Sequence, residues 1–115
     1  MNPQLSKSIL VPTFRSLTLI DHYDVTYIKA MQNYCMLYKK DGSQLLTSIS
    51  FGKVLEDIFT SDFYQCHRSF AVRLSCVNRY LKSGMVELDC GSKVPVSRRK
   101  KREFLEVVRN STSIV

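Results

Sequence analysis

The sequence lacks the patterns that mark several large classes of protein. No apolar run approaches the roughly 18 residues that a membrane-spanning helix needs. The start, MNPQLSKSILVPTF, has no apolar stretch of the about 7–15 residues typical of a signal peptide. There is no internal repeat and no low-complexity segment. With 115 residues, the chain is expected to form one cytoplasmic domain that does not insert into a membrane.

Residues that usually build catalytic or metal centres are scarce. The only histidines are His22 and His67, no Gly-rich phosphate loop occurs, and no carboxylates cluster as a two-metal site requires. The cysteines lack C-x-x-C spacing, and a strand would point the neighbours Cys66 and His67 to opposite faces. We therefore expect no enzyme, metal or cofactor. Without a secretion signal, free thiols are expected, with Cys76 and Cys90 as small core residues.

Positive charge is concentrated in the second half of the chain. Cations and carboxylates balance over residues 1–62, so the whole formal charge of +7 falls on residues 63–115. Five of these cations are consecutive, at positions 98–102. A run of this kind is most often a solvated face, but such an asymmetry favours a polyanionic partner.

Alternating apolar residues and turn signals predict a mainly β domain. The Asp41-Gly42 pair between two strand-like runs predicts a hairpin with a type I′ turn. Pro95 has no amide to donate, so its strand is expected at a sheet edge. The predicted strands cover residues 9–14, 15–20, 25–30, 34–39, 44–48, 63–66, 70–74, 77–82, 85–89 and 93–96.

Two short helices complete the predicted architecture. Apolar residues at helical spacing predict one from Phe51 to about Phe59, with Ser50 as its N-cap. The second is predicted from Arg98 to about residue 108, capped by Ser97. Cations in the first turn of a helix oppose its dipole by about 0.3–1 kcal/mol each. An external anion is the expected compensation.

The order of these elements resembles the LytTR-type DNA-binding domain, the output domain of LytR- and AgrA-like bacterial response regulators. The resemblance rests on VTYIKAMQNYCMLY, the Asp-Gly hairpin, SFGKVLEDIF, FYQCHRSFAVRLSCV and GMVELDCGSKVPVSRRKKREFL. It implies an elongated fold of small antiparallel sheets with two short helices. We expect an N-terminal extension with the first strands over residues 1–24, the domain over 25–110 and a tail over 111–115. Since about 24 residues precede Val25, the chain is expected to be either a stand-alone regulator or a fragment of one that carries a receiver domain or membrane segment.

The resemblance also implies which residues contact DNA. Family members read bases through three segments, which correspond here to residues 32–34, the His67-Arg68 corner and residues 97–100. Arg68 and Arg98 are the expected base contacts, because a guanidinium fork matches the acceptors of guanine, and Asn33 suits adenine. The candidate contact residues are Asn33, His67, Arg68, Ser97, Arg98, Arg99, Lys100 and Lys101, with Arg99, Lys100, Lys101 and Arg102 mainly contacting phosphate.

Simpler interpretations stand beside these. Arg68 could be a surface ion-pair partner, Asn33 a left-handed turn residue, and His67 a residue that bonds the backbone at its corner. For the whole chain we expect sequence-specific binding of promoter DNA in transcriptional regulation, with two protomers on paired repeats. The alternatives are an RNA-binding module with exposed stacking aromatics, or a basic module that docks on acidic proteins or membrane surfaces.

Overall fold

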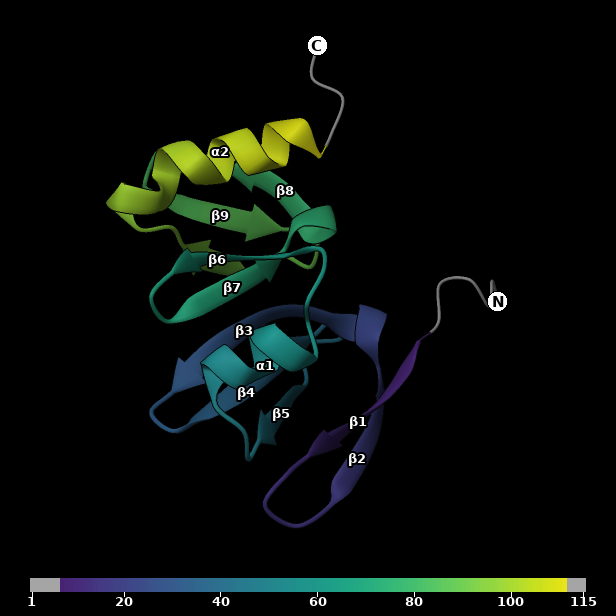
Figure 1. The fold of residues 1–115 in the computed structure, drawn as a ribbon. Coiled ribbons are helices and arrows are strands. Elements are labelled where there is room, and N and C mark those ends of the chain that lie inside the picture. The colour runs from purple at the N-terminus through teal and green to yellow at the C-terminus, as the bar shows by residue number, and fades with distance from the viewer. Residues whose placement is uncertain (1–6, 112–115) are drawn as a thin grey trace.

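A computed structural model describes residues 7–111 and contains three antiparallel sheets (Figure 1). The expected mainly β fold with two short helices is confirmed, with strand ends shifted by at most two residues. The tail beyond residue 111 lies outside the described residues. None of the helices within 7–111 is long and apolar enough to cross a membrane.

The three sheets follow one another along the chain. The first is the hairpin β1 (Ser8–Pro12) and β2 (Leu17–Asp21). The second has the order β5 (Gln44–Thr47), β4 (Tyr34–Lys39), β3 (Val25–Met31), β7 (Phe70–Arg73), β6 (Phe63–His67). The third has the order β10 (Lys93–Pro95), β9 (Met85–Leu88), β8 (Val77–Tyr80). Strand β10 with Pro95 is therefore at an edge, as predicted.

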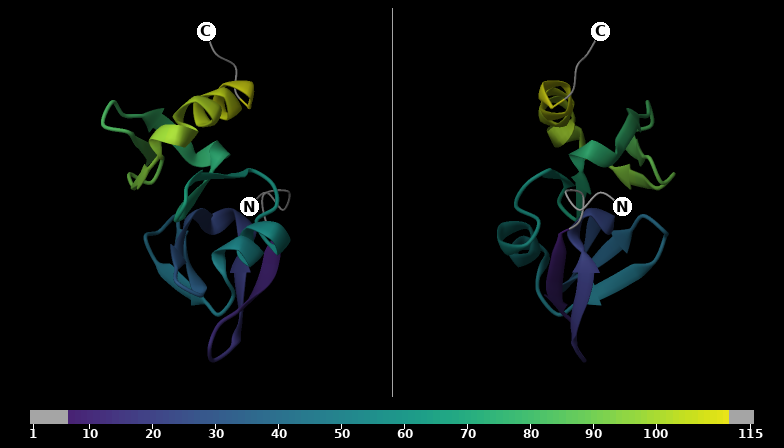
Figure 2. Two further views of the ribbon diagram at one scale, coloured as in Figure 1. Left: turned by 60° about the vertical axis from the view of Figure 1, so that its left-hand side comes forward. Right: turned by 90° about the vertical axis from the view of Figure 1, so that its right-hand side faces the viewer.

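The five-stranded sheet separates two hydrophobic cores. Successive side chains of a strand point to opposite faces, and on β7 Ala71 belongs to one core while Val72 belongs to the other. Helix α1 (Phe51–Asp57) and the β1–β2 hairpin cover the first face, and the three-stranded sheet and α2 (Lys101–Asn110) cover the second (Figure 2). Phe59 and Phe104 are the largest fully buried side chains, one in each core.

Both predicted N-caps form. The Ser50 hydroxyl accepts the Lys53 amide at 3.3 Å, and α1 ends at Asp57, two residues before the predicted end. The Ser97 hydroxyl accepts the Lys100 amide at 3.3 Å. That cap opens a 3₁₀ turn, η4 (Arg98–Lys100), and α2 begins only at Lys101. The predicted single helix is therefore divided, and three of the five cations precede its α-helical part.

The hairpin between β4 and β5 forms where predicted, but its turn type differs. Gly42 has φ +88°, whereas among the described non-glycine residues only Gln32 and Asp62 have positive φ. A type I′ turn needs positive φ at both central positions, so that prediction is wrong for Asp41. The physical reason is local, since Asp41 Oδ1 accepts the Ser43 amide at 2.9 Å and its hydroxyl at 2.6 Å.

The four cysteines are free thiols, but they are not equally buried. Cys35, Cys66 and Cys76 are buried. Cys90 is exposed, so its predicted place in the core is wrong. It follows β9 in a turn closed by Gly91, which has φ +92°, and a turn of this kind runs over the surface.

Candidate nucleic-acid interface

The corner between β6 and β7 presents Arg68 to solvent. The Ser69 amide donates to His67 Nδ1 at 3.1 Å, and Gln65 Nε2 donates to the Arg68 backbone oxygen at 3.4 Å. These bonds fix the corner around Arg68, whose side chain is exposed. Because His67 Nδ1 accepts, the neutral ring carries its proton on Nε2. The interpretation of His67 as a residue that holds the corner is confirmed.

The turn between β3 and β4 lies next to this corner. Strand β3 pairs antiparallel with β7, with Lys29 opposite Phe70, and the Ala30 amide donates to the Ser69 backbone oxygen at 2.8 Å. The end of β3 is therefore held beside the start of β7. Asn33 is exposed in the turn that follows, and the left-handed residue there is Gln32, with φ +55°. The interpretation of Asn33 as the left-handed residue is wrong.

The third predicted segment is tied to the same place from the other side. The Ser97 amide donates to the Cys66 backbone oxygen at 2.9 Å, and the Cys66 thiol donates to the Pro95 backbone oxygen at 3.4 Å. These bonds hold the start of η4 against β6, one residue before His67. The β3–β4 turn, the β6–β7 corner and η4 consequently lie on one side of the molecule, the left-hand side in Figure 1.

A hollow of about 470 Å³ opens between the corner and η4. Arg98 does not line it; with Lys101 it lines a neighbouring hollow of about 440 Å³. Asn33 belongs to the adjacent turn. Gln65 was not expected from the sequence, although its position two residues before His67 on β6 puts both on one face. The hollow is lined by Gln65, His67, Arg68, Ser97, Arg99 and Lys100.

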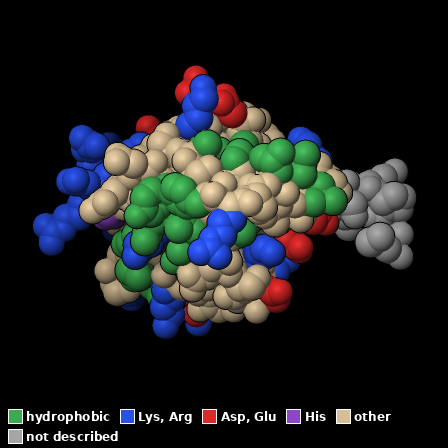
Figure 3. Space-filling model, turned by 90° about the horizontal axis from the view of Figure 1, so that it is seen from below, with side chains coloured by type: hydrophobic (Ala, Val, Ile, Leu, Met, Phe, Trp, Pro, Cys, Tyr) green, Lys and Arg blue, Asp and Glu red, His purple; other side chains and the backbone are tan. Residues whose placement is uncertain are grey.

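In the part of the chain that the structure describes, the cations around this hollow have no acidic partner. The ion pairs recorded over residues 7–111 join Lys53 with Asp57, Arg73 with Asp62, and Arg79 with Glu87. None involves Arg68 or residues 98–102, so the ion-pair interpretation of Arg68 is wrong. Seen from below, Lys and Arg side chains gather along the left-hand edge of the molecule (Figure 3). This side therefore presents positive charge to whatever approaches it.

Aromatic rings support two of these lysines. Lys100 Nζ lies 5.5 Å from the ring centroid of Tyr64, and Lys101 Nζ lies 5.6 Å from that of Tyr80. The Tyr64 hydroxyl donates to a carboxylate oxygen of Glu103, which joins β6 to α2. Burial, together with that carboxylate, raises the pKa of Tyr64 well above its usual value. The described residues contain no cluster of three His, Cys, Asp or Glu side chains that could hold a metal.

Comparison with known proteins points to one family. The family model of the LytTr DNA-binding domain matches residues 15–109. Among solved structures, the fold is similar to the LytTr DNA-binding domain of a Bacillus cereus protein assigned as a methyl-accepting/DNA response regulator. The TM-score is 0.71 and the identity 18%, over 89% of this chain and 96% of the other. No curated protein matches. Since the family model covers most of its length, the chain belongs to the LytTR family of DNA-binding domains.

Proposed function

We propose that this domain binds double-stranded DNA in a sequence-specific manner and regulates transcription from the promoters that carry its site. The observation that carries the proposal is the hollow lined by Arg68, Arg99 and Lys100, none of which forms an ion pair with a described carboxylate. Three unneutralised cations on one face favour a polyanion. Two of them are arginines, which can also read bases.

Within this proposal, Arg68 and Arg99 read bases together. Both line one hollow, on two segments whose backbones are joined by the bond from Ser97 to Cys66. A guanidinium group on a rigidly held segment can be oriented so that two of its N–H groups donate to O6 and N7 of guanine. Asn33 reads from the neighbouring turn. The base contact predicted for Arg98 stays a prediction, and the shared hollow favours Arg99 in that role.

The remaining candidate residues position the domain on the backbone. Lys100, Lys101 and Arg102 supply attraction to phosphates, and the Nε2–H of His67 is a donor for a phosphate oxygen. The Ser97 hydroxyl accepts the Lys100 amide, so its contribution is to fix the start of η4. These contacts add affinity and salt dependence without sequence information.

Two protomers on paired repeat sites form the proposed regulatory complex. The Bacillus cereus relative is assigned to a response regulator, and we extend that setting to this chain as an output domain. A receiver domain or membrane segment in a longer parent protein would then control the occupancy of the site.

Selection of bound duplexes from a random DNA pool tests the proposal. We expect enrichment of one motif, present as two spaced copies. Binding to the selected duplex, measured by fluorescence anisotropy, should exceed binding to a scrambled duplex at the same salt concentration. Single-stranded RNA of equal length serves as the competitor: under the RNA-binding alternative it should displace the duplex, and under our proposal it should not. Recovery of no motif, or equal affinity for the selected and scrambled duplexes, would contradict specific recognition.

A further inference from the structure

The β1–β2 hairpin carries an unusual concentration of exposed apolar side chains. Over residues 7–111, the exposed large hydrophobic residues are Leu10 (58% exposed), Phe14 (64%), Leu17 (66%), Leu19 (65%) and Tyr23 (37%). The first four belong to the two strands of the hairpin and the loop that joins them. Scattered single apolar residues on a surface are ordinary, whereas a contiguous group marks an interaction site.

The strand register places these leucines on one face. Leu10 is directly opposite Leu19, and Pro12 is opposite Leu17. The alternate positions, Val11 and Ile20, are buried in the first hydrophobic core. The hairpin is therefore apolar on both sides, and one side already has its partner. The other side, formed by Leu10, Leu17 and Leu19, is here termed the hairpin face. Phe14, in the loop, is also exposed, but its ring packs edge-on against Tyr34 of the same chain, with ring centroids 5.4 Å apart.

We propose that the hairpin face packs against the hairpin face of a second copy of this chain, around a two-fold axis. Two sheets that present apolar rows stack about 10 Å apart with interdigitating side chains. A two-fold arrangement requires one self-complementary surface. A row of leucines fits this requirement, because each copy offers the same apolar side chains to the other.

The distribution of charge favours this face for self-association. Residues 1–62, which include the hairpin, carry no net charge, whereas residues 63–115 carry the whole formal +7. Contact between two copies through the basic half would place like charges together. Contact through the hairpin avoids this and leaves the basic side free for DNA.

Charges at the two ends of the hairpin also select an orientation. Arg15 lies exposed in the loop between the strands, and Asp24 lies exposed at the opposite end, beside Lys40, whose amide donates to the Asp24 backbone oxygen at 2.8 Å. When two hairpins stack antiparallel, the loop of one lies over the opposite end of the other. Arg15 of one copy then approaches Asp24 of the second copy. A parallel stack would instead bring the two Arg15 side chains together.

The expected association is weak. Each of the three leucine side chains contributes on the order of 100 Å² of exposed surface, so two copies bury on the order of 600 Å² through them. Interfaces of this size are transient. Two copies bound to one DNA molecule have an effective concentration of about 1 mM, and under that condition a weak contact becomes populated.

Sedimentation equilibrium of the free chain, from about 10 μM to about 1 mM, tests the proposal without DNA. We expect a reversible monomer–dimer equilibrium. Leu19→Ser should remove it, because Leu19 lies at the centre of the hairpin face and its exposure makes the substitution compatible with folding. Lys82→Ser, on the β8–β9 turn, is the control and should associate as the wild type does. A wild type that stays monomeric at the highest concentration, or a dimer indifferent to Leu19→Ser, would overturn the proposal.

A charge exchange tests the orientation. Arg15→Asp should weaken association by several-fold, and combining it with Asp24→Arg should restore it. Failure of the double variant to recover would overturn the antiparallel arrangement. The Leu19→Ser variant should bind a duplex with a single site as well as the wild type does. The self-association can therefore fail without affecting the proposed function, and the proposed function can fail without affecting the dimer.

Discussion

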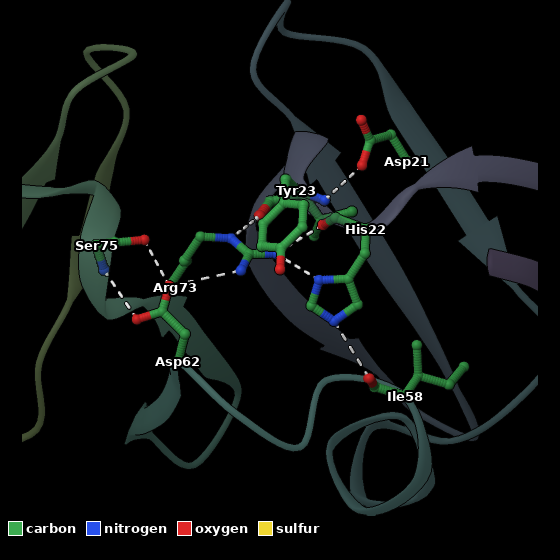
Figure 4. Close-up of polar contacts among 8 residues, drawn as sticks. Asp21, His22, Tyr23, Ile58, Asp62, Arg73 and Ser75 are labelled. Atoms are coloured by element: carbon green, nitrogen blue, oxygen red, sulfur yellow. Dashed lines mark hydrogen bonds and ion pairs between the residues drawn. The ribbon is translucent and has the colours of Figure 1, made fainter. Parts of the chain in front are cut away.

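The guanidinium of Arg73 donates through Nη2 to the backbone oxygen of His22 at 2.6 Å and to His22 Nδ1 at 3.2 Å (Figure 4). Arg73 is 2% exposed at the end of β7, and its Nε donates to the Val25 backbone oxygen at 2.8 Å. It also pairs with Asp62 at 3.5 Å and stacks 4.6 Å from the Phe63 ring centroid. One buried cation thus joins the segment after β2 to β3, β6 and β7, the strands that carry the turns proposed to contact DNA.

Replacing Arg73 by Met should destabilise the domain by about 2–4 kcal/mol. The methionine fills much of the space but leaves the backbone oxygens of Val25 and His22 without their donor, and an unsatisfied buried acceptor is unfavourable by about 1–3 kcal/mol. Urea unfolding followed by circular dichroism measures the change. Arg79→Met is the matched control. The Arg79 side chain is exposed where it pairs with Glu87, so its loss should change the free energy of unfolding much less than the loss of Arg73 does. If the two substitutions lowered the free energy of unfolding equally, the buried contacts of Arg73 would contribute no more to stability than an exposed ion pair.

The same contact predicts a loss of stability in mild acid. Burial, together with the charge of Arg73, lowers the pKa of His22 below its usual 6.5 in the folded chain. The neutral ring fits its site, because Nδ1 accepts from Arg73 and Nε2 donates to the Ile58 backbone oxygen at 3.3 Å. The unfolded chain binds a proton more readily, so the contribution of His22 is fully present above pH 6.5 and is lost as the pH falls through the lowered value.

Urea unfolding between pH 8 and pH 5 measures this effect. The free energy of unfolding should fall below pH 6.5 with a slope of up to about 1.4 kcal/mol per pH unit from this residue. His22→Gln should remove that part of the slope while lowering stability at pH 8. An unchanged slope in His22→Gln would mean that other groups cause the acid sensitivity.

The sequence revealed the strands and caps because they depend on neighbouring residues. Alternation predicts strands, and Ser50 and Ser97 act within three residues of themselves. The role of Arg73 could not be read in this way, since its partners Val25 and His22 lie 48 and 51 residues away. In the sequence, Arg73 looks like any other arginine of the basic second half of the chain.

The sequence also could not predict whether Arg98 or Arg99 lies beside Arg68, but for a different reason. In a run of five cations, every position offers the same chemistry. Which side chain faces Arg68 depends on the phase of the turn that carries the run. An α-helix was predicted from Arg98, but the chain forms a 3₁₀ turn over Arg98–Lys100. Such a turn has three residues per turn instead of 3.6, so successive side chains are about 120° apart. Arg99 consequently lines the hollow with Arg68, while Arg98 lines the neighbouring hollow with Lys101.

Cys90 should be the thiol that reacts first with alkylating agents. Burial tends to raise its pKa, but hydrogen bonds from the Ser92 hydroxyl and amide are the main effects that outweigh this, and the net pKa is lowered. Burial raises the pKa of Cys35 and of Cys66 to about 12. A lower pKa and exposure both favour the reactive thiolate. Limited treatment with iodoacetamide at pH 7.5, followed by mass spectrometry of peptides, should therefore find the label on Cys90. Cys90→Ser should remove the fast phase, and fast labelling of Cys66 instead would contradict the prediction.

Arg99→Ala and Arg98→Ala should affect DNA binding in different ways. If Arg99 contacts bases beside Arg68, its loss should reduce the preference for the selected duplex over a scrambled one by about 1–3 kcal/mol. If Arg98 contacts phosphate, its loss should weaken binding to both duplexes alike and reduce the slope of log affinity against log salt by about one. Anisotropy titrations of each variant at several salt concentrations separate the two effects. Both side chains are exposed, so equal stability of the variants is expected and serves as the control. The reverse outcome, with specificity lost in Arg98→Ala and retained in Arg99→Ala, would assign the second base contact to Arg98 and exclude the shared hollow as the reading site.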